Sequence, residues 1–316
     1  MFKILITFFV VASLSLFAQQ QKEPSKSFMA SGDVQDMVIS ENTLYVATDA
    51  SKVDIFDLDT KILSKSIQIP TIKDFMGKEI NSKIYSVDVL GKDIIFVSEG
   101  EGGYRVLWRY SNEKLEKLID TNKKHFIREA RFVDKSKILM GLLTNEHILY
   151  DTVQKKVIYN TQFSTSSFSD FTLSEDKTKY VSTDESGIVR VVDTKTSNVI
   201  EELPPKNVDR VYQLDYKKGV VLTAGQDRRA VVYKPFGTYH FEFEFLLYAS
   251  ALNTNATLGA VAYNIQNDVL VFDVESKQKL YSLTNARATI TKILFINDNE
   301  LLVSSDSKQI NYYKLK

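Results

Sequence analysis

The sequence predicts an all-β fold made of seven similar four-stranded sheets. A short apolar motif with a polar last residue occurs seven times, the chain between the copies breaks into short runs rich in Val, Ile, Tyr and Phe, and Gly (12) and Pro (5) are scarce. The copies end at residues 57, 109, 151, 193, 234, 273 and 314, so they lie 52, 42, 42, 41, 39 and 41 residues apart. A period near 41 residues is the length of four short strands with their turns, which indicates a seven-bladed β-propeller.

Each repeat contains the same four elements. The motif is the third strand, at residues 53–57, 105–109, 147–151, 189–193, 230–234, 269–273 and 310–314. The second strand comes before it, at residues 44–48, 94–98, 138–142, 180–183, 220–224, 258–262 and 301–305, and a polar turn such as 184–187 separates the two. The first strand lies earlier, as at 84–90, 127–133, 208–215 and 290–296, and a fourth follows the motif, as at 277–283. Short strands separated by turns are typical of antiparallel sheets.

The second and third strands are apolar at successive positions rather than at every other position. This pattern is expected for strands that are buried on both faces. Blades that stack against their neighbours around a ring bury their middle strands in this way, so the pattern supports the propeller over an open sheet.

The two ends of the chain are expected to meet. The seventh motif runs almost to Lys316, which leaves its blade with three strands and an unpaired edge. The segment Ser27, Phe28, Met29 and Ala30 stands before the first blade and has no other partner in the sequence. Placing it beside the seventh motif supplies the missing fourth strand and removes the exposed edge.

The first 18 residues have the pattern of a Sec-type signal peptide. Lys3 is followed by an uncharged apolar run over residues 4–18 that ends in Ala18. An uncleaved membrane anchor is the alternative, but this run is shorter than the roughly 20 residues that a bilayer requires. No Cys follows that could carry a lipid. We therefore expect cleavage of residues 1–18 and a single periplasmic domain over residues 19–316, without a stable membrane span.

Composition excludes several classes of function. The chain has 40 Lys and Arg against 40 Asp and Glu, so it lacks the basic excess of a nucleic-acid-binding protein. The absence of Cys excludes disulfides, thiolate zinc sites, cysteine-bound iron–sulfur clusters and a cysteine nucleophile. His125, His147 and His240 are too far apart in the sequence to form a metal-binding motif.

Motifs for catalysis are also lacking. The turn at residues 99–103 is rich in Gly, but the segment after it has the pattern of a strand and not of a phosphate-binding helix. There is no nucleophile elbow, and the carboxylates are too scattered to identify a general acid–base pair. We expect no catalytic residues, no metal and no cofactor.

The single long gap between repeats contains the candidate binding loop. Residues 70–83 make the connection between the first two blades some ten residues longer than its counterparts. Phe75 and Met76 are apolar residues in an otherwise charged loop, which is typical of a partner-binding site. The alternative is that Phe75 folds back and plugs the ring. The expected partner-binding residues are Asp74, Phe75, Met76, Lys78, Glu79, Tyr104, Asp227, Arg228 and Arg229, all at one end of the ring.

Two resemblances follow from these motifs. The fifth repeat, residues 223–234, is similar to a WD40 repeat, with Asp227 at the position of the Asp that fixes the turn in that family. The Trp-Asp and Gly-His pairs of the family are missing, so only its fold is implied. Residues 72–77, 82–88, 223–229 and 308–316 resemble the WD40-like L components encoded with periplasmic nitrate reductases (Nap) of epsilon-class proteobacteria. That resemblance implies a periplasmic, non-catalytic helper protein with a nitrate reductase component as partner.

The sequence therefore favours a non-catalytic protein-interaction scaffold. The alternative is a propeller-type envelope enzyme, such as a lactonase or hydrolase, with its site in the central channel.

Overall fold

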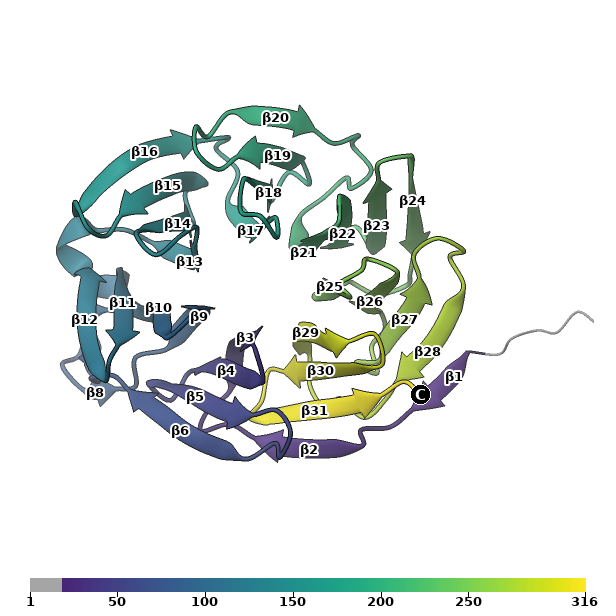
Figure 1. Ribbon diagram of the computed structural model, residues 1–316, viewed down its shortest axis with the longest axis horizontal. Coiled ribbons are helices and arrows are strands. Elements are labelled where there is room, and N and C mark those ends of the chain that lie inside the picture. Colours follow the sequence, from purple (N-terminus) through teal and green to yellow (C-terminus); the bar gives the residue numbers. More distant parts are fainter. Residues whose placement is uncertain (1–18) are drawn as a thin grey trace, which may run out of the picture.

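The computed structural model describes residues 19–316, which form a ring of seven antiparallel sheets (Figure 1). The expected signal peptide at residues 1–18 lies outside the described residues. Every sheet has its first strand at the central channel and its last strand at the outer rim. The all-β, seven-bladed propeller predicted from the repeat period is confirmed.

The strands of the first four blades follow the order of the sequence. Blade one contains β3 (Val34–Ser40), β4 (Thr43–Thr48), β5 (Lys52–Asp57) and β6 (Leu63–Gln68). Blade two contains β9 (Ile84–Leu90), β10 (Asp93–Glu99), β11 (Arg105–Ser111) and β12 (Lys114–Ile119). Blade three contains β13 (Ile127–Phe132), β14 (Lys137–Leu142), β15 (Glu146–Asp151) and β16 (Lys156–Gln162). Blade four contains β17 (Phe168–Leu173), β18 (Lys179–Asp184), β19 (Val189–Asp193) and β20 (Val199–Glu202).

The last three blades complete the ring. Blade five contains β21 (Val211–Lys217), β22 (Val220–Gly225), β23 (Arg229–Lys234) and β24 (Gly237–Glu242). Blade six contains β25 (Ser250–Leu252), β26 (Leu258–Ala262), β27 (Val269–Asp273) and β28 (Lys279–Leu283). Blade seven contains β29 (Ile290–Asn297), β30 (Glu300–Ser305) and β31 (Gln309–Lys314).

The N-terminal segment adds strands to two blades. β2 (Lys26–Met29) pairs antiparallel with β31, so it forms the outer strand of blade seven. β1 (Gln20–Lys22) pairs with β28 in parallel and gives blade six a fifth strand, which the sequence analysis did not anticipate. Residues 20–29 therefore run along the rim of two neighbouring blades (Figure 1).

The hydrophobic core consists of separate clusters, most of which lie between adjacent blades. One of these clusters joins Val53 and Ile67 of blade one to Val87, Phe96 and Trp108 of blade two. The middle strands are buried on both faces, as in β22, where all six residues are buried. The stacking predicted from the apolar pattern of the second and third strands is therefore confirmed.

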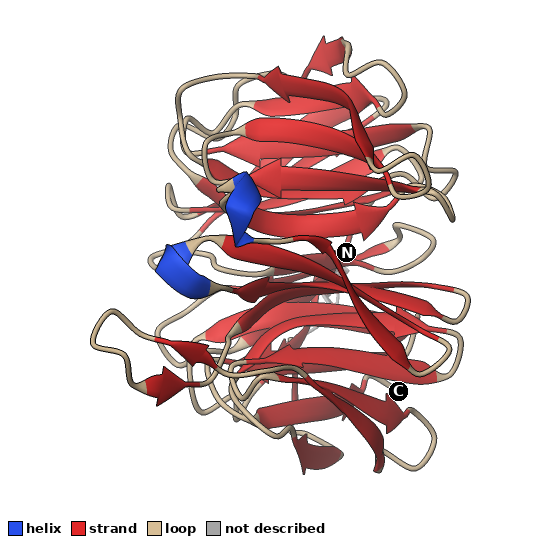
Figure 2. Ribbon diagram, turned by 90° about the vertical axis from the view of Figure 1, so that its left-hand side faces the viewer, coloured by secondary structure: helices blue, strands red, loops and turns tan. Residues whose placement is uncertain are grey.

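The two faces of the ring carry different loops. We call the upper face the one formed by the connections between blades and by the turns between second and third strands. It carries the small hairpin β7 (Ile72–Lys73) and β8 (Glu79–Ile80), and the short 3-10 turns η1 (Glu101–Gly103) and η2 (Thr121–Lys123). In Figure 2 the hairpin and both turns lie on the same side of the ring. The other turns form the lower face.

The innermost strands share one irregularity. In six of the seven, a register shift follows the first residue of the strand, as between Val34 and Asp36 or between Val211 and Gln213. A bulge of this kind redirects the side chains next to it. It turns the second and third residues of these strands toward the channel at the upper end. Among residues 19–316, no helix has the length and apolar character needed to cross a membrane.

Candidate functional site on the upper face and in the channel

The candidate binding loop ends in a tight turn that Asp74 organises. The Oδ1 atom of Asp74 accepts hydrogen bonds from the backbone N–H groups of Met76 and Lys78, each at 2.9 Å. Gly77 closes the turn with a φ of +79°, a conformation that favours glycine. The β7–β8 strands pair Lys73 with Glu79 below it. Asp74 therefore shapes the loop, which leaves the residues at its tip free to project.

Phe75 and Met76 project into solvent at this tip. Phe75 is 98% exposed and Met76 is 80% exposed. The alternative in which Phe75 plugs the ring is therefore wrong, because a plug would be buried in the channel. Lys78 and Glu79 are exposed beside them. Two large apolar side chains that bury almost no surface contribute little to the stability of the fold. Their contact with a partner stays a prediction.

Tyr104 lies in the same sector of the ring, at the end of η1. Its ring packs against that of Phe126, with a centroid distance of 5.1 Å. Phe126 is 39% exposed, so this pair forms a second aromatic patch near the hairpin. The next residue, Arg105, places its guanidinium 4.1 Å from the ring centroid of Tyr85, at the upper mouth of the channel. The upper face of blade two is thus aromatic and cationic.

Asp227, Arg228 and Arg229 lie in blade five, on the upper face but in another sector. Asp227 accepts hydrogen bonds from the backbone N–H groups of Val208 at 2.9 Å and Arg229 at 3.1 Å. Asp227 forms no ion pair with an arginine side chain among the described residues, because its oxygens accept hydrogen bonds within the turn. The guanidinium of Arg229 donates to the carbonyl of Lys206 at 2.9 Å. The structure does not bring these residues together with the hairpin.

The channel holds a cluster of charged residues that the sequence analysis did not identify. The third position of the inner strands is polar in six of the seven blades: Asp36, Ser86, Glu129, Asp170, Gln213 and Lys292. Several of these side chains accept hydrogen bonds from the next blade, as Asp170 does from Leu214 N–H at 2.9 Å. An inner strand has no neighbouring strand on the channel side, which leaves some of its backbone N–H groups without a strand partner. The polar side chains of the adjacent blade accept hydrogen bonds from these groups.

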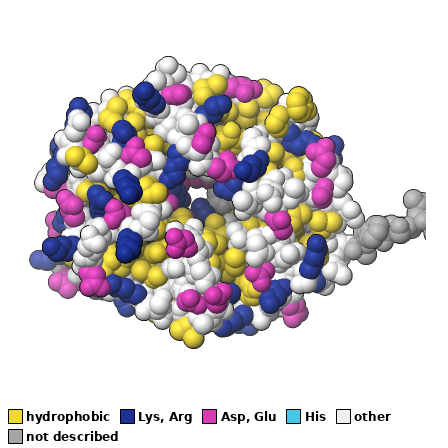
Figure 3. All heavy atoms as spheres, viewed as in Figure 1, with side chains coloured by type: hydrophobic (Ala, Val, Ile, Leu, Met, Phe, Trp, Pro, Cys, Tyr) yellow, Lys and Arg dark blue, Asp and Glu magenta, His cyan; other side chains and the backbone are white. Residues whose placement is uncertain are grey.

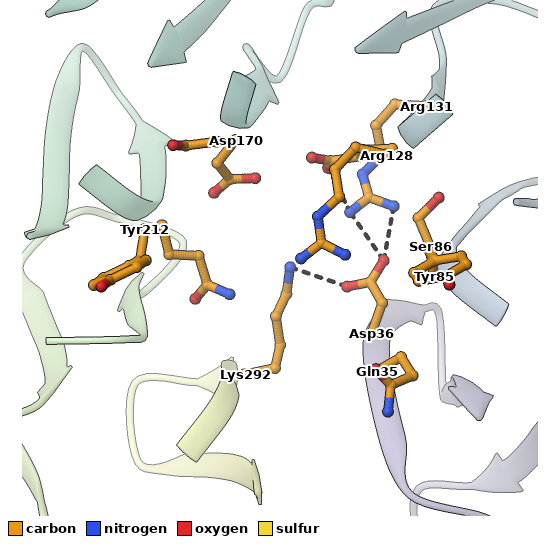
Figure 4. Close-up of a pocket in the computed structure, with 12 residues that line it drawn as sticks. Gln35, Asp36, Tyr85, Ser86, Arg128, Arg131, Asp170, Tyr212 and Lys292 are labelled. Carbon is orange, nitrogen blue, oxygen red and sulfur yellow. Dashed lines mark hydrogen bonds and ion pairs between the residues drawn. The ribbon is translucent and has the colours of Figure 1, made fainter. Parts of the chain in front are cut away.

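Asp36 is the centre of this cluster. Its Oδ2 atom lies 3.0 Å from both Nη atoms of Arg131, and its Oδ1 atom lies 3.0 Å from Nζ of Lys292 (Figure 4). Burial alone would raise the pKa of Asp36, but the charges of Arg131 and Lys292 outweigh it and lower the pKa to about 2. Burial likewise opposes the charged forms of Arg131 and Lys292, yet the neighbouring carboxylates raise the pKa of each. The three residues join blades one, three and seven.

Glu129 and Asp170 form a pair of buried carboxyl groups. Glu129 accepts from Arg131 at 2.7 Å, whereas no cation is within ion-pair distance of Asp170 among the residues that the structure describes. Burial, the charge of Glu129 and a hydrogen bond to Glu129 raise the pKa of Asp170 well above its ordinary value. Such a pair is able to share and hold a proton. The sequence could not identify it, because the two residues are on different blades and belong to no local motif.

The cluster divides the channel into two cavities. The upper one is small, and the lower one has a volume of about 360 Å³ with an apolar wall that includes Leu252, Leu294 and Phe295. Glu129, Arg131, Asp170 and Lys292 line both cavities, so they separate the two. Figure 3 shows the central opening of the ring, with basic side chains at its margin.

Comparison with known proteins shows the fold alone. No protein-family model matches the sequence, and no curated protein sequence matches it. Among solved structures, the chain is similar to the β-propeller domain of Cps50 (Swd1) from Myceliophteria thermophila, with a TM-score of 0.75 over 93% of this chain and 100% of that one. The two sequences are only 11% identical. The WD40-like, seven-bladed propeller is thus supported, and its function has to be argued from the surface and the channel.

Proposed function

We propose that the protein is a non-catalytic scaffold that binds a protein partner on its upper face. The observation that carries this proposal is the hairpin tip, where Phe75 and Met76 are almost fully exposed on a turn that Asp74 holds rigid. Exposed apolar side chains on a projecting loop are typical of protein-binding sites. The aromatic pair of Tyr104 and Phe126 extends the apolar surface in the same sector.

We further propose that the scaffold works in the periplasm and assists nitrate reduction. The apolar run at residues 4–18 supports export. The resemblance of four stretches to the L components of Nap systems supports the pathway, and one of those stretches, residues 72–77, contains the hairpin tip. The partner would then be a component of the periplasmic nitrate reductase.

A deletion strain and an affinity capture test this proposal together. We expect a strain without the protein to lose part of its periplasmic nitrate reduction while its other respiratory routes stay intact. A tagged copy should retain a reductase component from periplasmic extract, and purified protein alone should not reduce nitrate. Unchanged nitrate reduction in the deletion strain, with no reductase component captured, would refute the role in nitrate reduction. The proposal of a protein-binding scaffold would then be tested separately with variants of the hairpin.

One observation favours an enzyme as the second candidate. Glu129 and Asp170 place two carboxyl groups at the end of a 360 Å³ cavity, which is large enough for a small substrate, and the pKa of Asp170 is raised well above its ordinary value. A propeller-type hydrolase would need these groups as general acid and base, or a metal ion beside them. A stoichiometric, tightly bound metal in the purified protein would favour this candidate over the scaffold.

A further inference from the structure

The upper part of the channel contains a small cavity at the ends of the inner strands. Its volume is about 50 Å³, and its walls come from six of the seven blades. A single water needs roughly 10–15 Å³ on this measure, so the cavity has room for about four waters or for one ion of similar size. Any ligand here must therefore be small and compact.

Hydrogen-bond donors without acceptors converge on this cavity. The guanidinium of Arg128 donates to no acceptor among residues 19–316, and it turns toward the same space as the ammonium of Lys292 (Figure 4). Lys292 reaches a single acceptor in the described part of the chain, Asp36.

The carboxylates at the cavity are, in contrast, largely paired. Both oxygens of Asp36 and one oxygen of Glu129 bind Arg131 or Lys292, and one oxygen of Asp170 accepts the backbone N–H of Leu214. The lining holds three acidic residues (Asp36, Glu129 and Asp170) and three basic ones (Arg128, Arg131 and Lys292). When Asp170 carries its proton, which its raised pKa favours, three positive charges face two negative ones. The cavity then has one positive charge in excess, which favours an anion over a cation.

We propose that this cavity binds one small, singly charged oxyanion of the carboxylate type, held by Arg128 and Lys292. A carboxylate accepts the fork of an arginine and a lysine N–H at once, and charge-assisted hydrogen bonds of this kind are the strong ones. The carboxylate can belong to a free ion or to an acidic side chain that a docked protein inserts from the upper face. This site is separate from the hairpin, so the scaffold proposal does not depend on it.

Titration of the purified protein with formate, acetate and N-acetyl-aspartate amide tests the proposal. Calorimetry measures the binding, with chloride keeping the ionic strength constant, and each bound anion should also raise the melting temperature. Arg128→Gln should weaken binding about tenfold or more, since it removes a charge-assisted contact.

Two control variants keep the result interpretable. Arg105 is on the same face and lies over Tyr85, but it does not line the cavity. Arg105→Gln therefore removes a nearby cation and should leave the affinity for the anion unchanged. Asp170→Asn fixes the neutral form and should keep the binding. Arg128 is exposed, so its replacement should not alter the melting temperature without added anion.

The probes also identify the source of the carboxylate. Arg128-dependent binding of formate or acetate supports a site for a free ion. Arg128-dependent binding of N-acetyl-aspartate amide alone supports insertion of a side chain by a partner. If none of the three binds, or if Arg128→Gln leaves their binding unchanged, the proposal is wrong.

Discussion

A buried histidine shows how strongly the fold changes the pKa of a single residue. His147 lies on β15 and is fully buried. Its ring stacks on that of Tyr180 at a centroid distance of 5.4 Å and is tilted against that of Phe163 at 4.7 Å. Its Nε2 atom is 3.2 Å from the hydroxyl group of Ser182. Burial, reinforced by the charge of Arg190, lowers the pKa of His147 to about 3 from 6.5. The histidine is therefore a neutral part of an aromatic cluster.

This shift predicts a loss of stability in mild acid. The folded state keeps His147 neutral down to about pH 3, whereas the unfolded chain takes up a proton below about pH 6.5, so the free energy of unfolding falls between these values. By pH 5 the loss should be about 2 kcal/mol. Denaturant unfolding at pH 7 and pH 5 measures it.

Two variants isolate the contribution of this histidine. His147→Phe should remove most of the difference between the two pH values, although its stability is lower at both because Ser182 loses its partner. The exposed His240, changed to Gln, serves as the matched control and should keep the wild-type difference. An unchanged difference in His147→Phe would show that other groups cause the pH dependence.

The charged channel could not be predicted residue by residue. Asp36, Arg131 and Lys292 are 95 and 161 residues apart, and each is on a different blade. One signal was present, because the third position of almost every inner strand is polar. Using it requires the register of all seven repeats and the bulges that turn these side chains inward. Local pattern predicts strands but not bulges.

At the scale of elements, the periodic strands were the predictable part. The first strand expected at residues 84–90 is β9, and the second strand expected at 94–98 is the centre of β10. The hairpin in residues 70–83 and the parallel strand β1 were not predicted. Each is only two or three residues long and polar, so neither has enough apolar periodicity to separate it from a loop.

The exposed hairpin predicts a variant that is stable and defective in binding. Changing Phe75 and Met76 to Ser should leave the free energy of unfolding within about 0.5 kcal/mol, because neither side chain is packed. Capture of the partner from periplasmic extract should fall sharply. A melting curve and a quantitative pull-down give the two readouts.

Phe236 provides the matched control for this experiment. It is 95% exposed in the turn between β23 and β24, on the lower face. Phe236→Ser removes the same kind of exposed aromatic surface and should keep full capture. Equal loss in both variants, or no loss in either, would contradict a partner site at the hairpin.

At the scale of the whole molecule, the outer strand of blade seven comes from the opposite end of the chain. Phe28 of β2 is buried, with its ring centroid 5.0 Å from that of Phe56 in blade one. Ser27 donates a hydrogen bond to Asn311 at 2.7 Å. The pairing of β2 with β31 thus covers an edge and adds an apolar contact across the junction of blades seven and one.

Removing this contact should destabilise the ring. Phe28→Ala is expected to lower the free energy of unfolding by about 3–5 kcal/mol, as for other buried aromatic residues. Met29→Ala, at a 58% exposed position of the same strand, should change it by less than about 0.5 kcal/mol. Deletion of residues 19–32 should lower the melting temperature further and promote aggregation through the free edge of β31. Equal melting temperatures for the deletion and the full chain would refute a closing role for β2.

The pairing of β2 with β31 also makes closure of the ring a late step in folding. Ser27 and Asn311 are 284 residues apart, so the last blade gains its outer strand only when two distant segments of the chain meet. Contacts of such long range form late and slowly. Until they form, the edge of β31 is open, and an open strand edge promotes aggregation. Closure of the ring therefore ends the stage of folding at which the protein is most prone to aggregate.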